Sequence, residues 1–366
     1  MRTALRELRR MPGRFFAVGT ALMVIAVLVL VLGAILDGLI RGSTGVLRAQ
    51  AGPLLVYDDE ARQTLLRSRV DADLAGQVAA VDGVTEVRGL GVTNVTVDPP
   101  GEATSDDGLL GIVVVGAEGE NLRLTPPERG EAVADSRILD EGFAVGDVVA
   151  LPGGVEVEIV STVRDATTNL APSLWVDLTT WREVTVAARP DAGLAEGVVQ
   201  ALNVLVEDGR DPLEVAAAID QATGRTQTLD RAAAISAIPG VSSQQSVFTA
   251  IIAATLVVAA LVVALFFVLL TLERRGLYAV LKAIGASTGR LLGGLVVQAV
   301  VVAAGAAAGA AVLTVGLLAV IPDAIPVELR AGRVVVALTG LLLMSALGSV
   351  FSLRRLVRVD PADAIG

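Results

Sequence analysis

Long apolar runs alternate with polar segments along this chain, and four of the runs are long enough to cross a bilayer. A transmembrane helix needs about 20 mostly apolar residues. The four runs cover Phe15–Leu36, Phe248–Leu272, Leu291–Ile321 and Val334–Leu353. The third exceeds that length, so we expect it to tilt, kink or protrude. A signal peptide is the alternative for the first, but its apolar run is too long and no A-x-A cleavage site follows.

Between the first and second apolar runs, the shorter repeats of apolar positions predict a mixed α/β domain. Strand, helix and strand patterns follow one another at 53–97 and again at 201–229, where Asp211 caps the helix before Pro212. Strand patterns fill the interval, with a hairpin turn at 152–154. The expected fold class is an α-helical membrane protein with four transmembrane helices and an inserted extracytoplasmic α/β domain. That domain is expected to combine a split strand–helix–strand sandwich with a small β subdomain.

Composition supports membrane spans and excludes several kinds of site. Hydrophobic residues make up 53% of the chain and its mean hydropathy is +0.68. Cysteine and histidine are absent, which excludes disulfides, zinc sites with Cys or His ligands, and His-based triads. We therefore expect no metal or cofactor in this chain. Lys282, the only lysine, is followed by Ala283, so no G-x-x-x-x-G-K-[ST] phosphate loop exists and ATP hydrolysis requires another chain.

The distribution of charge predicts the orientation. Twelve basic and only four acidic residues lie in the N-terminal segment, between the second and third runs, and in the tail. By the positive-inside rule these three segments are cytoplasmic. Residues 42–245 carry 32 acidic and 14 basic residues, as expected of a solvated extracytoplasmic surface; attraction of cationic peptides or calcium is the alternative.

The predicted organisation follows from these runs and charges. Both termini face the cytoplasm and the protein resides in the cell membrane. The segments are a cytoplasmic N-terminus (1–14), a first span (15–40), the extracytoplasmic domain (41–246), a second span (247–272), a cytoplasmic helix (273–289), a third span (290–321), an outer loop (322–333), a fourth span (334–353) and a cytoplasmic tail (354–366).

The segment 273–289 predicts a short amphipathic helix at the inner membrane surface. Apolar residues share one face, basic residues occupy others, and Gly285 and Ser287 suit a helix end and the next helix start. The residues on these faces are Leu277, Tyr278, Leu281 and Ile284, and Arg274, Arg275 and Lys282. Fixing the topology and binding anionic lipid headgroups is one role for such a helix, and docking on a partner is the other.

Three stretches resemble the MacB/FtsX-type (type VII) permeases of ABC transporters. They are ERRGLYAVLKAIGAS at 273–287, the tail LRRLVRVDPADAIG, and ALRELRRMPGRF before the first span. YAVLKAIGA and the strand SLWVDL are most similar to the DevC-like branch. The resemblance implies a permease subunit that forms a homodimer in the lipid bilayer and works with two copies of an ABC ATPase subunit, which holds ATP and Mg. An adaptor or a cell-wall hydrolase would be a further partner, and nucleic acid would not.

The resemblance also implies a role for the helix at 273–289. In the family this segment is the coupling helix that docks on the ATPase. The matching residues are Arg274, Arg275, Tyr278, Leu281, Lys282, Ala283, Ile284, Gly285 and Ala286. Leu277 and Gly276 depart from the family, which commonly has charged or polar residues there, and Gln298 stands where relatives often have Glu. A polar contact to the ATPase is therefore in doubt, and no titratable group is expected at 298.

Small residues in the third and fourth spans predict close helix packing. Gly305 and Gly309 stand in the spacing G-A-A-A-G, and Gly340 and Gly348 lie in a small, weakly polar stripe. An Ala- and Gly-rich composition is the alternative explanation. No charged residue lies deep in any span, and Asp37 lies at the outer end of the first. Ion channels and proton-driven carriers need such groups, so energy should come from a partner.

The expected function is that of a non-catalytic permease subunit. ATP hydrolysis by the separate ATPase would change the shape of the extracytoplasmic domain, with export or extrusion of a lipid, lipoprotein, glycolipid or peptide. The alternative is FtsX-like signalling, in which the same motion activates a cell-wall hydrolase without moving cargo. A third hypothesis is a membrane-anchored domain with no ATPase, but four spans exceed what an anchor requires.

Overall fold

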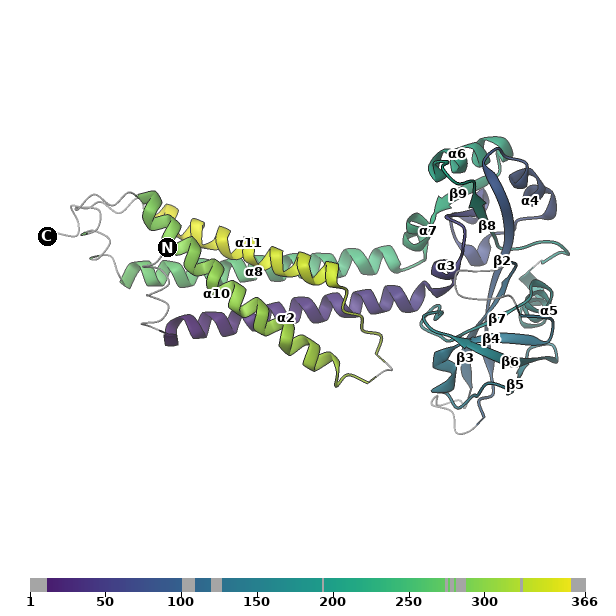
Figure 1. The fold of residues 1–366 in the computed structure, drawn as a ribbon, viewed down its shortest axis with the longest axis horizontal. Helices are drawn as coiled ribbons and strands as arrows, with labels where there is room; N and C mark the ends of the chain where they lie inside the picture. The colour runs from purple at the N-terminus through teal and green to yellow at the C-terminus, as the bar shows by residue number, and fades with distance from the viewer. Residues whose placement is uncertain are drawn as a thin grey trace. The chain divides into compact units, whose positions relative to one another are not determined.

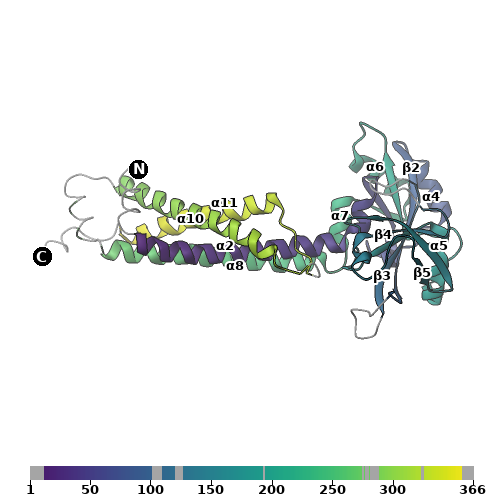
Figure 2. The same cartoon turned by 60° about the horizontal axis from the view of Figure 1, so that its bottom comes forward.

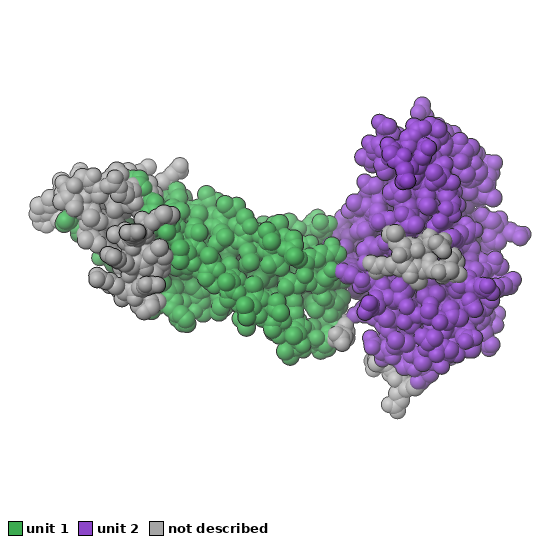
Figure 3. Space-filling model, in the orientation of Figure 1, with its two compact units in different colours: residues 1–38, 244–366 green, residues 39–243 purple. Residues whose placement is uncertain are grey.

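The computed structural model describes residues 12–100, 109–119, 127–192, 194–273, 276, 280, 288–322 and 325–356. The chain divides into two compact units (Figure 3). Residues 1–38 and 244–366 form a helical unit, and residues 39–243 form a sheet unit.

Four long helices make up the helical unit and lie beside one another in two views (Figures 1 and 2). They are α2 (Pro12–Ser43), α8 (Val241–Glu273), α10 (Thr288–Leu318) and α11 (Ala331–Leu356). All four are long and apolar enough to cross a membrane, with mean hydropathies of 2.2 to 3.1 over the most apolar window, which confirms the predicted number of spans. Helices α2 and α8 have 32 and 33 residues and α10 has 31, so the excess length expected of the third span is shared by the first two.

The four helices share one core, but most of their surface is not covered by this chain. Buried side chains from every helix meet in that core, and Phe266 of α8 stacks edge-on with Phe15 of α2 at 5.7 Å between ring centroids. Only 22% to 28% of the positions in each apolar window are buried. Helices with so much exposed aliphatic surface are typical of contact with lipid or with another transmembrane chain.

The described residues of the sheet unit form one mixed sheet of nine strands, in the order β5-β6-β4-β7-β3-β2-β8-β1-β9. The strands are β1 (Leu54–Asp58), β2 (Val84–Val97), β3 (Leu110–Ala117), β4 (Glu131–Asp135), β5 (Val148–Leu151), β6 (Val155–Val163), β7 (Ser173–Val176), β8 (Ala201–Val206) and β9 (Thr226–Asp230). The predicted strand–helix–strand segments place β2, β8, β1 and β9 side by side. The strands of the predicted β subdomain continue the same sheet rather than forming a second one.

The 14-residue strand β2 joins the two halves of the sheet. Its first half, from Val84 to Leu90, pairs with β8, and its second half, from Leu90 to Val97, pairs with β3. The strand is longer than the usual five or six residues, and its two pairings share only Leu90. A change in one half of the sheet is thus connected through continuous backbone to the other.

Short helices cover the sheet. They are α3 (Gly45–Ala49), α4 (Ala72–Ala79), α5 (Leu178–Ala188), α6 (Pro212–Thr223) and α7 (Arg231–Ala237). The predicted cap is present at α6, where the carboxylate of Asp211 accepts a hydrogen bond from a backbone N–H group of the first turn, and Asp71 caps α4 in the same way. Helices α4 and α6 bury Leu74, Val78 and Ile219 in one core with β1 and β8.

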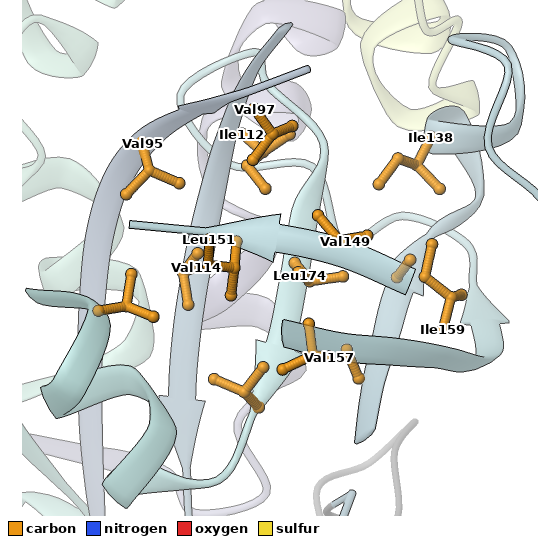
Figure 4. Close-up of a cluster of buried hydrophobic side chains, with 14 of the residues drawn as sticks. Val95, Val97, Ile112, Val114, Ile138, Val149, Leu151, Val157, Ile159 and Leu174 are labelled. Carbon is orange, nitrogen blue, oxygen red and sulfur yellow. The ribbon is translucent and has the colours of Figure 1, made fainter. Parts of the chain in front are cut away.

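A second core lies where α5 covers the other half of the sheet, around β5, β6 and β3 (Figure 4). Trp181 of α5 is buried, and a Cβ at Gly91 or Gly116 would overlap its side chain. The sequence did not predict α5, and the two glycines are the signal for it, because glycine in a strand often marks a close approach from another element.

Candidate functional site

The predicted coupling residues lie outside the described residues. These are Arg274, Arg275, Tyr278, Leu281, Lys282, Ala283, Ile284, Gly285 and Ala286. Their flanks are described: α8 ends at Glu273 and α10 begins at Thr288. The candidate site therefore consists of those side chains, as a prediction, together with the described contacts that connect the helices to the sheet.

The first such contacts lie where α2 continues into the sheet unit, in the entry segment, residues 41–52. The guanidinium of Arg41 binds the carboxylate of Asp165 with two of its nitrogens, with Nε at 2.9 Å from Oδ1. Arg48 donates to the backbone oxygens of Arg41 (2.8 Å) and Asp165 (3.1 Å) and to the hydroxyl of Thr44 (3.0 Å). Because the Arg41 fork is planar and two-pronged, it fixes the orientation of the last turn of α2 as well as its distance.

Backbone hydrogen bonds add to this attachment through the junction loop, residues 164–171, which joins β6 to β7. The N–H of Gly45 donates to the oxygen of Thr167 (2.9 Å), and the N–H of Leu170 donates to the oxygen of Gly42 (3.0 Å). A Cβ at Gly45 would overlap the backbone of residues 166 and 167. Only glycine permits this approach, so the end of α2 lies directly against the loop.

The junction loop is connected in turn to the sheet by Asp135, the last residue of β4. The Asp135 carboxylate is fully buried and accepts hydrogen bonds from the N–H of Ala166 (2.7 Å), the N–H of Arg137 (3.0 Å) and the hydroxyl of Thr167 (3.4 Å). A buried carboxylate that loses such donors is costly. A continuous series of contacts therefore leads from the last turn of α2 through the junction loop to β4.

The second connection lies on the return segment, residues 226–241, which leads from β9 to α8. The guanidinium of Arg231 donates to the backbone oxygens of Gln50 (2.8 Å) and Gly52 (3.1 Å). The side-chain amide of Asn203, on β8, accepts from the N–H of Gly52 (2.9 Å) and donates to its oxygen (3.1 Å). The two chain segments that continue into α2 and α8 are therefore bound to each other at residues 50–52, and α3 contacts α7.

In the helical unit, a buried ion pair joins α2 to α11. Arg333 donates from two nitrogens to the two carboxylate oxygens of Asp37, each at 2.6 Å. Asp37 is only 2% exposed. The loop before α11 approaches the same turn, since the N–H of Glu328 donates to the oxygen of Ala34 (2.9 Å). A carboxylate that is so fully buried is expected only where a cation is paired with it.

The glycines predicted to pack helices differ from one another. A Cβ at Gly348 would overlap the carbonyl oxygen of Ala260 on α8. A Cβ at Gly340 would lie 3.2 Å from Leu256 Cδ1, and one at Gly309 would lie 3.0 Å from Met23 Sδ. A Cβ at Gly305 would have no described atom within 4 Å. Gly348 thus lets α11 approach the backbone of α8. The face of α10 at Gly305 is open to lipid or another chain.

The sequence predicts neither charged pair and no buried carboxylate at 135. It indicates only that Asp37 lies at the outer end of the first span. The distances along the chain between Asp37 and Arg333, and between Arg41 and Asp165, left no local signal. Among the described residues, no group of three or more acidic side chains could hold a metal ion.

Comparison with known proteins identifies the C-terminal part of the chain. The family described as "FtsX-like permease C-terminal" matches residues 249–361, from α8 through α10 and α11. Residues 249–361 form an FtsX-like permease domain. This domain contains the predicted coupling segment and three of the four apolar helices.

Relatives that match part of this chain are permeases by name. Rv2563 of Mycobacterium tuberculosis (strain H37Rv), an uncharacterised ABC transporter permease, is 38% identical over 110 residues, which cover 30% of this chain and 31% of the relative. HrtB of Staphylococcus epidermidis (strain RP62A), whose name places it in a hemin transport system, is 22% identical over 129 residues, or 35% of this chain and 37% of the relative. The chain thus spans about a third of the length of the curated relatives it matches.

Two solved structures are each similar to about half of the chain. The extracellular domain of the ABC-type transporter YknZ from Gram-positive bacteria aligns with 48% of this chain and 98% of its own, at 14% identity and a TM-score of 0.32. The periplasmic region of MacB from Actinobacillus actinomycetemcomitans aligns with 50% of this chain and 91% of its own, at 10% identity and a TM-score of 0.33.

Proposed function

We propose that this chain is the permease subunit of an ABC transporter and that it transmits ATP-driven motion from a separate ATPase to the sheet unit. The FtsX-like permease domain at residues 249–361 is the observation that carries the proposal. The permease names of the relatives support it. The chain would contribute binding and motion, and the ATPase would contribute the chemistry.

The proposed path begins at the segment 273–289, which faces the cytoplasm in this scheme. Arg274, Arg275 and Lys282 would contact the ATPase, and the apolar side chains of the segment would lie against it or the membrane. Motion of this segment would pass into α8, which continues from Glu273 to Val241 without a break. The other end of α8 is preceded along the chain by α7, whose first residue, Arg231, binds residues 50–52. Residues 50–52 follow α2 and α3. A shift of α8 relative to α2 would therefore strain the base of the sheet unit.

The sheet unit is suited to respond to such a shift. The junction loop holds the end of α2, Asp135 holds the loop, and β2 connects both halves of the sheet. The exposed apolar surface of the four helices supports a second copy of the chain as a partner, with two ATPase subunits. The cargo class that we favour is an amphiphile.

Charge reversal in the coupling segment tests this function. The full chain would be purified with its ATPase, and ATP hydrolysis and co-purification would be measured for the Arg275→Glu and Lys282→Glu variants. We expect a loss of the ATPase bound per chain of at least tenfold for the double variant, because attractive contacts become repulsive. Arg330→Glu, on the loop before α11, is the matched control and should leave the complex intact. Unchanged binding and hydrolysis in the double variant would refute the proposed coupling.

A further inference from the structure

An apolar cavity lies at the base of the sheet unit, between the entry segment and the return segment. Its volume is about 90 Å³, and its walls come from α3, β1, the turn at 63–66, the junction loop and α7. The side chains that give it its character are Val46, Leu47, Tyr57, Leu66, Ala234 and Ile238. We call it the base cavity. An engineered cavity of about 150 Å³ with similar lining stays dry and binds benzene or xenon, so this volume suits a few carbon atoms.

The lining of the base cavity includes residues at the end of α2 and just before the start of α8. Ser43, the last residue of α2, lines it, and so does Pro239, which lies two residues before the first residue of α8. Two residues of extended chain reach at most about 7 Å. If α2 and α8 cross the membrane, as the proposed function requires, the base cavity therefore lies within a few residues of both outer span ends. Asn169 and Pro239 are exposed, so the cavity opens to the surface on their side.

The chemistry of the base cavity favours a hydrocarbon over a charged group. Basic and acidic side chains are absent from the lining among the described residues. The Tyr57 phenol is 1% exposed, and burial raises its pKa far above the ordinary value, so it stays neutral. A neutral phenol with an apolar body can lie against an aliphatic chain while its hydroxyl remains a polar handle.

Two unusual backbone conformations border the same cavity. Gln63 and Asn169 have φ angles of 61° and 52°, in the left-handed region that favours glycine. Such residues persist only where the surrounding structure maintains them, and they gather at binding sites.

We propose that the base cavity binds the terminal carbons of an aliphatic chain that belongs to a membrane amphiphile. The proposal rests on the proposed function, since the outer leaflet supplies the amphiphile only if the sheet unit is extracytoplasmic. It narrows the cargo class to molecules with an alkyl tail. Occupation of the cavity holds the entry and return segments in one relative position, so binding of the tail is coupled to the helices that would carry the motion.

A photoreactive lipid tests the base cavity directly. The full chain would be reconstituted in phosphatidylcholine vesicles that contain a phosphatidylcholine with a diazirine on its terminal acyl carbon. After illumination, mass spectrometry locates the labelled residues. We expect labels on residues 43–47, 65–66 and 234–239, and none there from a lipid with its diazirine beside the headgroup.

Cavity filling provides matched variants. Ala234→Leu adds three carbon atoms at a position that is 2% exposed and lines the cavity, whereas Ala232→Leu adds the same atoms on the exposed face of α7. Since each buried methylene is worth about fourfold in binding, we expect Ala234→Leu to lower labelling at least tenfold and Ala232→Leu to leave it unchanged. If Ala234→Leu does not fold, Leu66→Ala enlarges the cavity and should retain or increase the labelling.

Labels confined to the long helices would overturn the proposal, and so would equal labelling of the Ala234→Leu variant. The lipid probe would also stay on the long helices if the cavity received an apolar side chain of a protein partner. The assay contains no ATPase, so its outcome is separate from the coupling experiment. Labelling of the cavity with no ATPase coupling would sink the proposed function alone, and the reverse result would sink only the site.

Discussion

Asp37 and Arg333 show how one charged pair can order the ends of two apolar helices. The carboxylate of Asp37 is almost fully buried, while about a third of the Arg333 side chain is exposed. The pair therefore keeps its cation at the surface and its anion inside. A pair of this kind contributes little net stability compared with an apolar replacement, but removal of one partner is costly because the other remains buried and charged.

This asymmetry predicts that Arg333→Ala destabilises the protein more than Asp37→Asn. We expect a loss of about 3 kcal/mol for Arg333→Ala, since it leaves a buried carboxylate without its partner. Thermal unfolding of the full chain in detergent measures the effect. The double variant Asp37→Asn with Arg333→Ala should be more stable than Arg333→Ala alone. Arg330→Ala, which removes an exposed cation, serves as the control with a change below about 0.5 kcal/mol. Equal losses at 330 and 333 would contradict the assignment.

Gly45 is the residue that permits contact between the entry segment and the junction loop. Gly45→Ala places a methyl group on the backbone of residues 166 and 167, and overpacking of this kind costs about 1–3 kcal/mol. Gly111→Ala is the control, because a Cβ there has open space, and its stability should be equal or slightly higher. Thermal unfolding distinguishes the two, and equal stability of the two variants would show that the loop does not lie against Gly45.

At the scale of elements, the attachment of α2 to the junction loop is a mechanical connection more than a source of stability. Arg41 and Asp165 are each about a third exposed, so solvent screens the pair and its net contribution is small. Its two-pronged geometry instead fixes the orientation of the last turn of α2 against the junction loop. In the proposed function, motion of α2 would reach the sheet through Asp135 and β4.

A double-mutant cycle separates these two roles. We expect Arg41→Ala and Asp165→Ala to lower stability by about 1 kcal/mol or less each, with a coupling energy of similar size. In the complex with the ATPase, each should weaken the response of the sheet unit to ATP much more than its effect on stability implies. Fluorescence from labels on the sheet unit reports that response. A response to ATP equal to that of the wild type in both variants would exclude the Arg41–Asp165 pair from the path.

The elements themselves were largely predictable from the sequence, but their partners were not. Apolar runs predicted the four long helices, and period-two patterns predicted β1, β2, β8 and β9, because these signals are local. Helix α5 was missed because its apolar residues, Trp181 and Val184, form too short a pattern over 11 residues. The contacts of Arg41 with Asp165 and of Arg231 with Gln50 join residues more than a hundred positions apart, which no local pattern encodes.

At the scale of the whole molecule, the account depends on which side of the membrane each part occupies. The FtsX-like permease domain includes the basic segment between α8 and α10, and the acidic sheet unit lies between α2 and α8 along the chain. Transmission from an ATPase to the sheet unit requires these two parts to be on opposite sides. The absence of cysteine from the sequence makes this requirement simple to test, since any single cysteine introduced is the only site for a thiol reagent.

The most direct measurement is the reaction of single cysteines with a membrane-impermeant maleimide in intact cells. Two variants of the full chain are compared: Lys282→Cys in the predicted coupling segment and Asp208→Cys, at an exposed turn of the sheet unit. The account predicts labelling of position 208 in intact cells, and of position 282 only after the membrane is permeabilised. Labelling of position 282 from outside intact cells would contradict the account, because no cytoplasmic ATPase could then reach the segment.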